Sequence, residues 1–157
     1  MTTPPDEIDR AIARLAIADL IAEFAYLIDH DRSDEVADLF TEDGSYGRIS
    51  GERSVGRDAL KRVYAARSAR GVRTARHLFT NVRLAFESND LVRGTCILLL
   101  FAEDGLPPLP AEVNLVSDYE DVFRRSDDGR WRFASRTVRH VFVHPDNRPP
   151  VLPLGSA

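Results

Sequence analysis

Two polar side chains lie where the hydrophobic pattern predicts buried positions. Asp29 follows Phe24, Leu27 and Ile28 on the side of a predicted helix that should face the core. His77 lies on a predicted strand and points to the same face as hydrophobic neighbours two residues away. Each has a simple explanation, since Asp29 can be a surface cap and His77 a hydrogen-bonded core residue. Together they also suggest a carboxylate–imidazole pair.

Such a pair can do acid–base chemistry. If the end of the helix lies over the sheet, the Asp29 carboxylate can reach one nitrogen of the His77 ring. The carboxylate then fixes the tautomer and stabilises the imidazolium, while the other nitrogen faces a pocket as a general base. Burial lowers the pKa of a histidine and a carboxylate partner raises it, so the sequence leaves the net direction open.

Arg136 is the third candidate. It lies on the last predicted strand with the same parity as Val138 and His140, so it either projects into the pocket or lies on the outer face. An inward guanidinium can hold a carboxylate or a developing oxyanion. Trp131 and Phe133 have the opposite parity, and either a β-bulge or a sheet that is covered on both faces would reconcile this.

Further side chains can line the same pocket. We expect the substrate-binding residues to be Phe24, Tyr26, Tyr46, Phe79, Asn81 and His140, with Tyr64 as another possible proton donor. The alternative for each tyrosine is a half-buried ring with its hydroxyl in water.

No set of metal ligands is apparent. His140 and His144 share a strand face, but no third ligand stands at a suitable spacing. The glycines do not form a phosphate-binding loop, and the single cysteine, Cys96, lies in an apolar run typical of a core strand. We therefore expect neither a metal nor a cofactor.

The first half of the chain is predicted to be mainly helical. Capping residues at positions 3–6 precede an amphipathic helix that runs to about Ile28. A second short helix covers residues 33–40 and leads through a turn at 41–44 into a strand at 45–50. Residues 51–56 form a loop before a third helix at 57–70.

The second half is predicted to be a sheet. Strands at residues 74–87 and 91–101 form one hairpin, and strands at 113–125 and 130–143 form another across an Asp-Gly turn. Helices segregated from an antiparallel sheet define the α+β class. We expect one domain over residues 1–157, with a core at about 6–144 and a proline-rich tail at 145–157, in which helices close the concave side of a curved sheet around a pocket.

Composition excludes several functions. The chain has 21 basic and 25 acidic residues, a net charge of −4, and no basic block that would follow a phosphate backbone. We therefore expect no nucleic-acid partner. The longest apolar run is too short to span a bilayer and the N-terminus lacks an apolar signal segment, so we expect a cytoplasmic protein without a membrane partner.

These motifs resemble one protein family when taken in order. They are the helix that ends in Asp29, the helix at 33–40 with its Thr-Glu-Asp-Gly turn, the Arg-His start of the strand at His77, and the closing segment 128–133. Together they are similar to the SnoaL-like branch of the nuclear transport factor 2-like superfamily, over roughly residues 6–144. The resemblance implies a cone-shaped α+β barrel of three N-terminal helices on a strongly curved, mostly antiparallel sheet that encloses an apolar pocket.

Within this superfamily the chain looks closest to the group of scytalone dehydratase, hexachlorocyclohexane dehydrochlorinase and bile-acid 7α-dehydratase. The resemblance implies His77 as the general base, Asp29 as its orienting carboxylate and Arg136 as a contact to the substrate or leaving group. The last two relatives have a polar residue five positions before the aspartate, where this chain has Phe24. Tyr26, Tyr46 or His140 are the candidates to replace it.

The resemblance therefore implies a cofactor-independent lyase of the dehydratase type, or an isomerase, that acts on a hydrophobic steroid, polyketide or aromatic molecule. Two alternatives stay open: a small-molecule-binding module without turnover, and an accessory β-subunit of an oxygenase. Because a copy of the chain commonly covers the back of a curved sheet, we also expect a homo-oligomer, and the resemblance suggests a trimer or a dimer.

Overall fold

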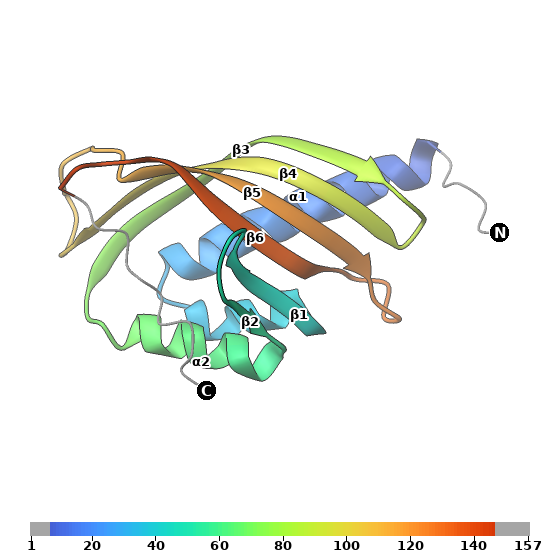
Figure 1. Cartoon of the computed structure of the whole chain (residues 1–157), viewed down its shortest axis with the longest axis horizontal. Coiled ribbons are helices and arrows are strands. Elements are labelled where there is room, and N and C mark those ends of the chain that lie inside the picture. The colour runs from blue at the N-terminus through green and yellow to red at the C-terminus, as the bar shows by residue number, and fades with distance from the viewer. Residues whose placement is uncertain (1–6, 147–157) are drawn as a thin grey trace.

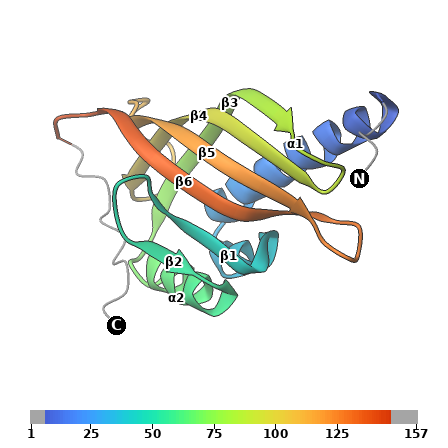
Figure 2. The ribbon, with the colours of Figure 1, turned by 45° about the vertical axis from the view of Figure 1, so that its right-hand side comes forward.

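The computed structural model describes residues 7–146. Three helical segments pack on the concave side of one six-stranded sheet, and the sheet curves around the long first helix (Figures 1 and 2). This confirms the predicted α+β class and the order of helices before sheet. The expected capping residues at 3–6 and most of the expected tail lie outside the described residues.

Helix α1, Glu7–Asp29, supplies the main contact between the helical layer and the sheet. From Ile17 onward its buried residues recur at three- and four-residue spacing, the last of them being Phe24, Leu27 and Ile28. This periodicity lays the C-terminal half of the helix along the inner face of β3, Arg73–Phe86, and β6, Trp131–Val143. Asp29, the last helical residue, thereby comes to rest over the start of β3.

The connection between α1 and the third helix differs in detail from the prediction. The second helix is a 3₁₀ helix, η1, at Ser33–Leu39, and the following strand β1 covers Phe40–Arg48. The predicted turn at 41–44 lies inside this strand, where its register with β6 shifts. The predicted loop at 51–56 contains a short strand, β2, at Arg53–Val55, and helix α2 then covers Arg57–Ser68.

The sheet has the strand order β2-β1-β6-β5-β4-β3 and does not close into a barrel. Its long strands are β3, β4 at Leu91–Asp104, β5 at Leu115–Arg125, and β6. They form the two predicted hairpins and pair antiparallel, whereas β1 pairs parallel to β6. β3 is therefore an edge strand, and within residues 7–146 no strand pairs with its outer backbone groups.

A bulge in β6 resolves the conflict of parity at Arg136. Val122 pairs with Ser135 and the next residue, Phe123, pairs with Phe133, so Ala134 is an extra residue on β6. Phe133 and Arg136 are consequently both buried on the inner face, although three positions separate them.

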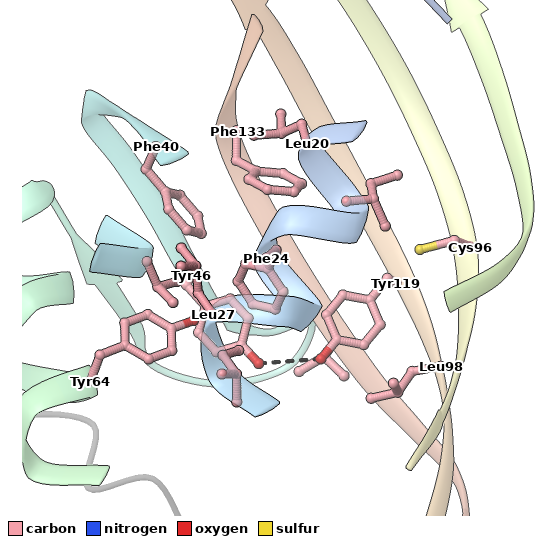
Figure 3. Packing of buried hydrophobic residues seen from close by; sticks show 14 of the residues in the cluster. Leu20, Phe24, Leu27, Phe40, Tyr46, Tyr64, Cys96, Leu98, Tyr119 and Phe133 are labelled. Carbon is pink, nitrogen blue, oxygen red and sulfur yellow. Dashed lines mark hydrogen bonds between the residues drawn. The ribbon is translucent and has the colours of Figure 1, made fainter. Parts of the chain in front are cut away.

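Buried aliphatic and aromatic side chains fill the space between helices and sheet, with a group of aromatic rings among them (Figure 3). The Phe24 ring lies at their centre, with five ring centroids 5.7 to 6.4 Å away, those of Phe40, Tyr46, Tyr64, Phe79 and Phe133. Cys96 is buried beside them, as its apolar run predicts. Within the described residues, no helix is long and apolar enough to cross a membrane.

Gly94 allows β4 to approach this aromatic core. A Cβ at this position would lie 2.7 Å from the Phe123 ring and 3.0 Å from a Leu84 methyl group. We expect Gly94→Ala to lower the free energy of unfolding by about 1–3 kcal/mol, because the strands must separate or the ring must leave its rotamer. Urea denaturation measures the change.

The control is Gly51→Ala, whose new Cβ would come no closer than 3.4 Å to any other side chain. It should change the stability by less than about 0.5 kcal/mol. A Gly94→Ala variant as stable as the wild type would show that the neighbouring side chains can move aside at this point without loss of stability.

Candidate active site

Asp29 and His77 form a buried, doubly hydrogen-bonded pair. The Asp29 Oδ1 lies 2.6 Å from the ring nitrogen Nδ1 of His77, and the backbone N–H of His77 donates to Oδ2 at 2.8 Å. Each side chain is only 6% exposed. The backbone N–H is available because β3 is an edge strand, and the Asp29 carboxylate takes the place of a neighbouring strand. Asp29 is therefore no surface cap.

This geometry fixes the proton on the histidine. A carboxylate only accepts hydrogen bonds, so Nδ1 carries the hydrogen and Nε2 keeps its lone pair in the neutral ring. Burial lowers the pKa of His77 below its ordinary value of 6.5, and this effect outweighs the opposing influence of the Asp29 carboxylate. Arg67 and Arg136 lower it further. The ring is thus neutral at pH 7, in the state that a general base requires.

Arg136 projects inward and is completely buried. Its guanidinium binds the Asp121 carboxylate through two hydrogen bonds, from Nε at 3.0 Å and from Nη2 at 3.2 Å. Burial by itself lowers the pKa of Arg136, but Asp121 and its other neighbours outweigh this and the net shift is upward. Burial raises the pKa of the Asp121 carboxyl, and the arginine opposes that rise.

Aromatic rings surround the guanidinium. Its Cζ lies 4.3 to 4.6 Å from four ring centroids, those of Phe24, Phe79, Tyr119 and Phe133. Such cation–π contacts partly replace the lost hydration of a buried charge. The Nη1 atom, in contrast, has no hydrogen-bond partner among the described residues.

Three tyrosine hydroxyls lie in the same interior. Those of Tyr46 and Tyr119 share one hydrogen bond of 3.3 Å. The buried hydroxyl of Tyr64 on α2 has no partner within residues 7–146, and its ring points towards Tyr46 (Figure 3). Burial raises the pKa of Tyr64 and Tyr119 well above 10, so both are neutral hydrogen-bond donors at pH 7.

The structure distributes the predicted substrate-binding residues over different environments. Phe24, Tyr46 and Phe79 lie in the interior with Arg136. His140 is half-buried and shares a 2.9 Å hydrogen bond with the fully buried Ser117.

Tyr26 and Asn81 do not lie in this interior. Tyr26 is 49% exposed and stacks on His30, because it lies on the solvent side of α1. Asn81 is exposed and has a φ of 53°, at the point where the register of β3 with β4 shifts. This irregularity breaks the two-residue alternation that was used to place Asn81 beside His77.

Asp121 is the main residue that sequence reasoning missed. The inward positions of β5 are Leu115, Ser117, Tyr119, Asp121 and Phe123. An acid between an inward tyrosine and an inward phenylalanine is the same signal that singled out Asp29.

Among the described residues, no cluster of three or more histidine, cysteine or acidic side chains could hold a metal ion.

An open cleft of about 580 Å³ adjoins the dyad. Ile28, next to Asp29, and Ala75, two residues before His77, lie on its wall. The C-terminal ends of α1 and α2 and the start of β3 enclose it. Its lining carries charges of both signs, from Arg67, Arg70, Arg73, Asp31 and Asp104. Its lining includes neighbours of the dyad in the chain, but neither Asp29 nor His77 itself.

Comparison with known proteins specifies the family to which this fold belongs. The chain belongs to the SnoaL-like domain family, whose model matches residues 9–137. No match was found among curated proteins.

Solved structures agree with this assignment. A candidate scytalone dehydratase from Novosphingobium aromaticivorans is 23% identical, with a TM-score of 0.77 over 95% of this chain and 97% of that one. A hexachlorocyclohexane dehydrochlorinase is 19% identical, with a TM-score of 0.72 over 93% and 99%. A protein from Catenulispora acidiphila in complex with S-DNPA is 26% identical, with a TM-score of 0.70 over 83% and 94%.

The lowered pKa of His77 predicts how stability depends on pH. The unfolded chain binds a proton at a higher pH than the folded chain does, so the contribution of neutral His77 is present above about pH 6.5 and is lost as the pH falls through the folded pKa. We expect wild type to lose more stability than His77→Gln between about pH 7.5 and about pH 5.5. Urea denaturation at the two pH values measures this.

Nuclear magnetic resonance titration of the His77 ring gives an independent reading, with its signals assigned by their loss in His77→Gln. A midpoint above 6.5 would mean that the Asp29 carboxylate outweighs burial.

Proposed function

We propose that this chain is a cytoplasmic, cofactor-independent lyase of the dehydratase type, or an isomerase, in which His77 removes a carbon-bound proton. The observation that carries the proposal is the Asp29–His77 pair, with Nδ1 held by the carboxylate at 2.6 Å. A neutral imidazole with a fixed tautomer presents Nε2 as the base, and the buried carboxylate stabilises the imidazolium that forms.

Removal of the proton leaves the electron pair of the C–H bond on carbon, and this pair needs an acceptor. In a ketone or enone they move to the carbonyl oxygen, which gains negative charge as the C–H bond breaks. The free Nη1 of Arg136 and the buried tyrosine hydroxyls are the donors suited to this oxygen. Return of the proton to another carbon gives isomerisation, and departure of a β-substituent gives elimination.

Elimination also needs an acid for the leaving group, and Phe24 supplies none. Tyr46 in the interior and the half-buried His140 remain candidates, whereas the exposed Tyr26 does not. The aromatic interior favours a hydrophobic substrate of steroid, polyketide or aromatic type, and the related protein that was solved in complex with S-DNPA supports a small-molecule ligand.

A second candidate function is ligand binding without turnover. It is favoured by the Arg136–Asp121 pair, because a cation that is already neutralised stabilises an oxyanion less than a free one. The test below distinguishes the two functions.

Hydrogen exchange tests proton abstraction without knowledge of the natural substrate. The protein is incubated in D₂O with 2-tetralone or with a 3-ketosteroid, and loss of the signals of the α-protons is followed by nuclear magnetic resonance. We expect wild type to accelerate the exchange, and His77→Gln to reduce the acceleration by roughly 10²-fold or more. Asp29→Asn, which disturbs the tautomer, should cost roughly 10²- to 10⁴-fold.

The matched control is His30→Gln, since His30 lies one residue after Asp29 but stacks on Tyr26 at the surface. It should exchange as fast as wild type. Full activity of a folded His77→Gln variant would end the proposal of a general base, and binding of the ketones without exchange would support the binding module.

We also propose self-association as a trimer or dimer. Leu78 on β3 and Phe142 on β6 are 48% and 68% exposed, and burying such residues against a second copy is favourable. Light scattering of the purified chain measures its mass in solution.

A further inference from the structure

Several hydrogen-bond donors in the buried interior have no acceptor among the described residues. The Asp121 carboxylate already accepts from Nε and Nη2 of Arg136. Nη1 of Arg136 and the hydroxyl of Tyr64 are buried without a partner among the described residues. The Tyr46 and Tyr119 hydroxyls share a single bond, so one of their two hydrogens is also unused. Buried donors of this kind call for an acceptor.

The charge of the interior is nevertheless not positive. Among the ions with nearly inaccessible side chains are Asp29 at 6% exposure, Asp121 at 1% and Arg136 at 0%. Two of these three are carboxylates. His77 is neutral at pH 7, and burial raises the pKa of the Cys96 thiol to about 12, so neither adds a positive charge.

These two observations select a class of ligand. An anionic group placed at Nη1 would meet the nearby Asp121 carboxylate in a medium of low polarity, where like charges repel strongly. A ketone, ester or amide oxygen accepts the same hydrogen bonds without bringing a charge.

We propose that the Arg136–Asp121 pair, with the tyrosine hydroxyls beside it, is a binding site for a neutral carbonyl oxygen, and that Asp121 makes the site reject carboxylates. Asp121 is a specificity-determining residue that acts through Arg136. The inference rests on the proposed function in placing a ligand in this interior, and it holds whether or not the ligand is turned over.

Two probes of equal shape test the choice between neutral and anionic groups. 2-Acetylnaphthalene carries a ketone and 2-naphthoate a carboxylate on the same ring system, and titration calorimetry near neutral pH measures the affinity for each. We expect wild type to bind the ketone with a dissociation constant below about 1 mM and the carboxylate about tenfold more weakly or worse.

Asp121→Asn removes the negative charge and keeps the shape of the side chain. The freed guanidinium should then attract the carboxylate, so the ratio of the two affinities should move towards 2-naphthoate by about tenfold or more.

The protein itself supplies the matched control. Asp118 lies on the same strand, three residues earlier, and pairs across β5 and β6 with Arg139 at 2.8 Å, but on the exposed side of the sheet. Asp118→Asn should leave the ratio unchanged.

A buried arginine without its partner can destabilise the fold, so a second variant is needed. Asp121→Asn combined with Arg136→Gln removes both charges together, and circular dichroism verifies that it is folded. It should bind the ketone several-fold more weakly than wild type, because the Nη1 donor is lost, and should not gain affinity for 2-naphthoate.

Several results would overturn the inference: equal or tighter binding of 2-naphthoate by wild type, no ketone binding below about 1 mM, or an unchanged ratio in folded Asp121→Asn. If Asp121→Asn does not fold, undiminished ketone binding by the double variant overturns it. These are equilibrium measurements. A loss of hydrogen exchange in His77→Gln tests the proposed function separately.

Discussion

A guanidinium cannot give up its charge, so a protein that buries one must build an environment for it. Arg136 is fully buried in a chain of 157 residues, and much of the interior is arranged around it. Asp121 neutralises the charge from the neighbouring strand, and four aromatic rings lie against the planar group. Removal of either ion alone would leave the other unpaired, which typically costs about 3–5 kcal/mol.

One irregularity of the backbone, the bulge at Ala134 in β6, places Arg136 in the interior. Without the extra residue in β6, Phe133 and Arg136 would point to opposite faces of the sheet, and one of them would leave the interior. The bulge therefore couples a local feature of strand pairing to the position of the charge. The Asp29 carboxylate similarly couples the end of α1 to the free edge of β3, since one of its oxygens binds backbone and the other binds the histidine ring.

Much of this was accessible from the sequence, because period and parity are local properties. The helix that ends near Asp29 and the inward direction of His77 follow from apolar spacing. The two hairpins follow from apolar spacing together with the turn residues between the strands. On the strands, parity is lost wherever the register shifts, whereas the exposure of Tyr26 reflects which side of α1 faces the solvent. The displacement of Asn81 and the inward direction of both Phe133 and Arg136 arise at such shifts, which depend on pairing with another strand. The partnership of Asp121 with Arg136 is likewise a tertiary contact, although the unusual acid on β5 was visible as a pattern.

Phe24 contributes to the packing of the core at a position where some relatives have a polar residue. Its ring packs on five other rings and on the guanidinium, so it helps both the hydrophobic core and the burial of the charge. A polar residue here would break up this aromatic cluster, and in exchange could assist a leaving group. The chain thus keeps a buried Asp29–His77 pair, while its core leaves no acid at position 24. Under the proposed function, this combination favours proton removal beside a neutral carbonyl over expulsion of a leaving group next to the helix, because that group would lack an acid from α1.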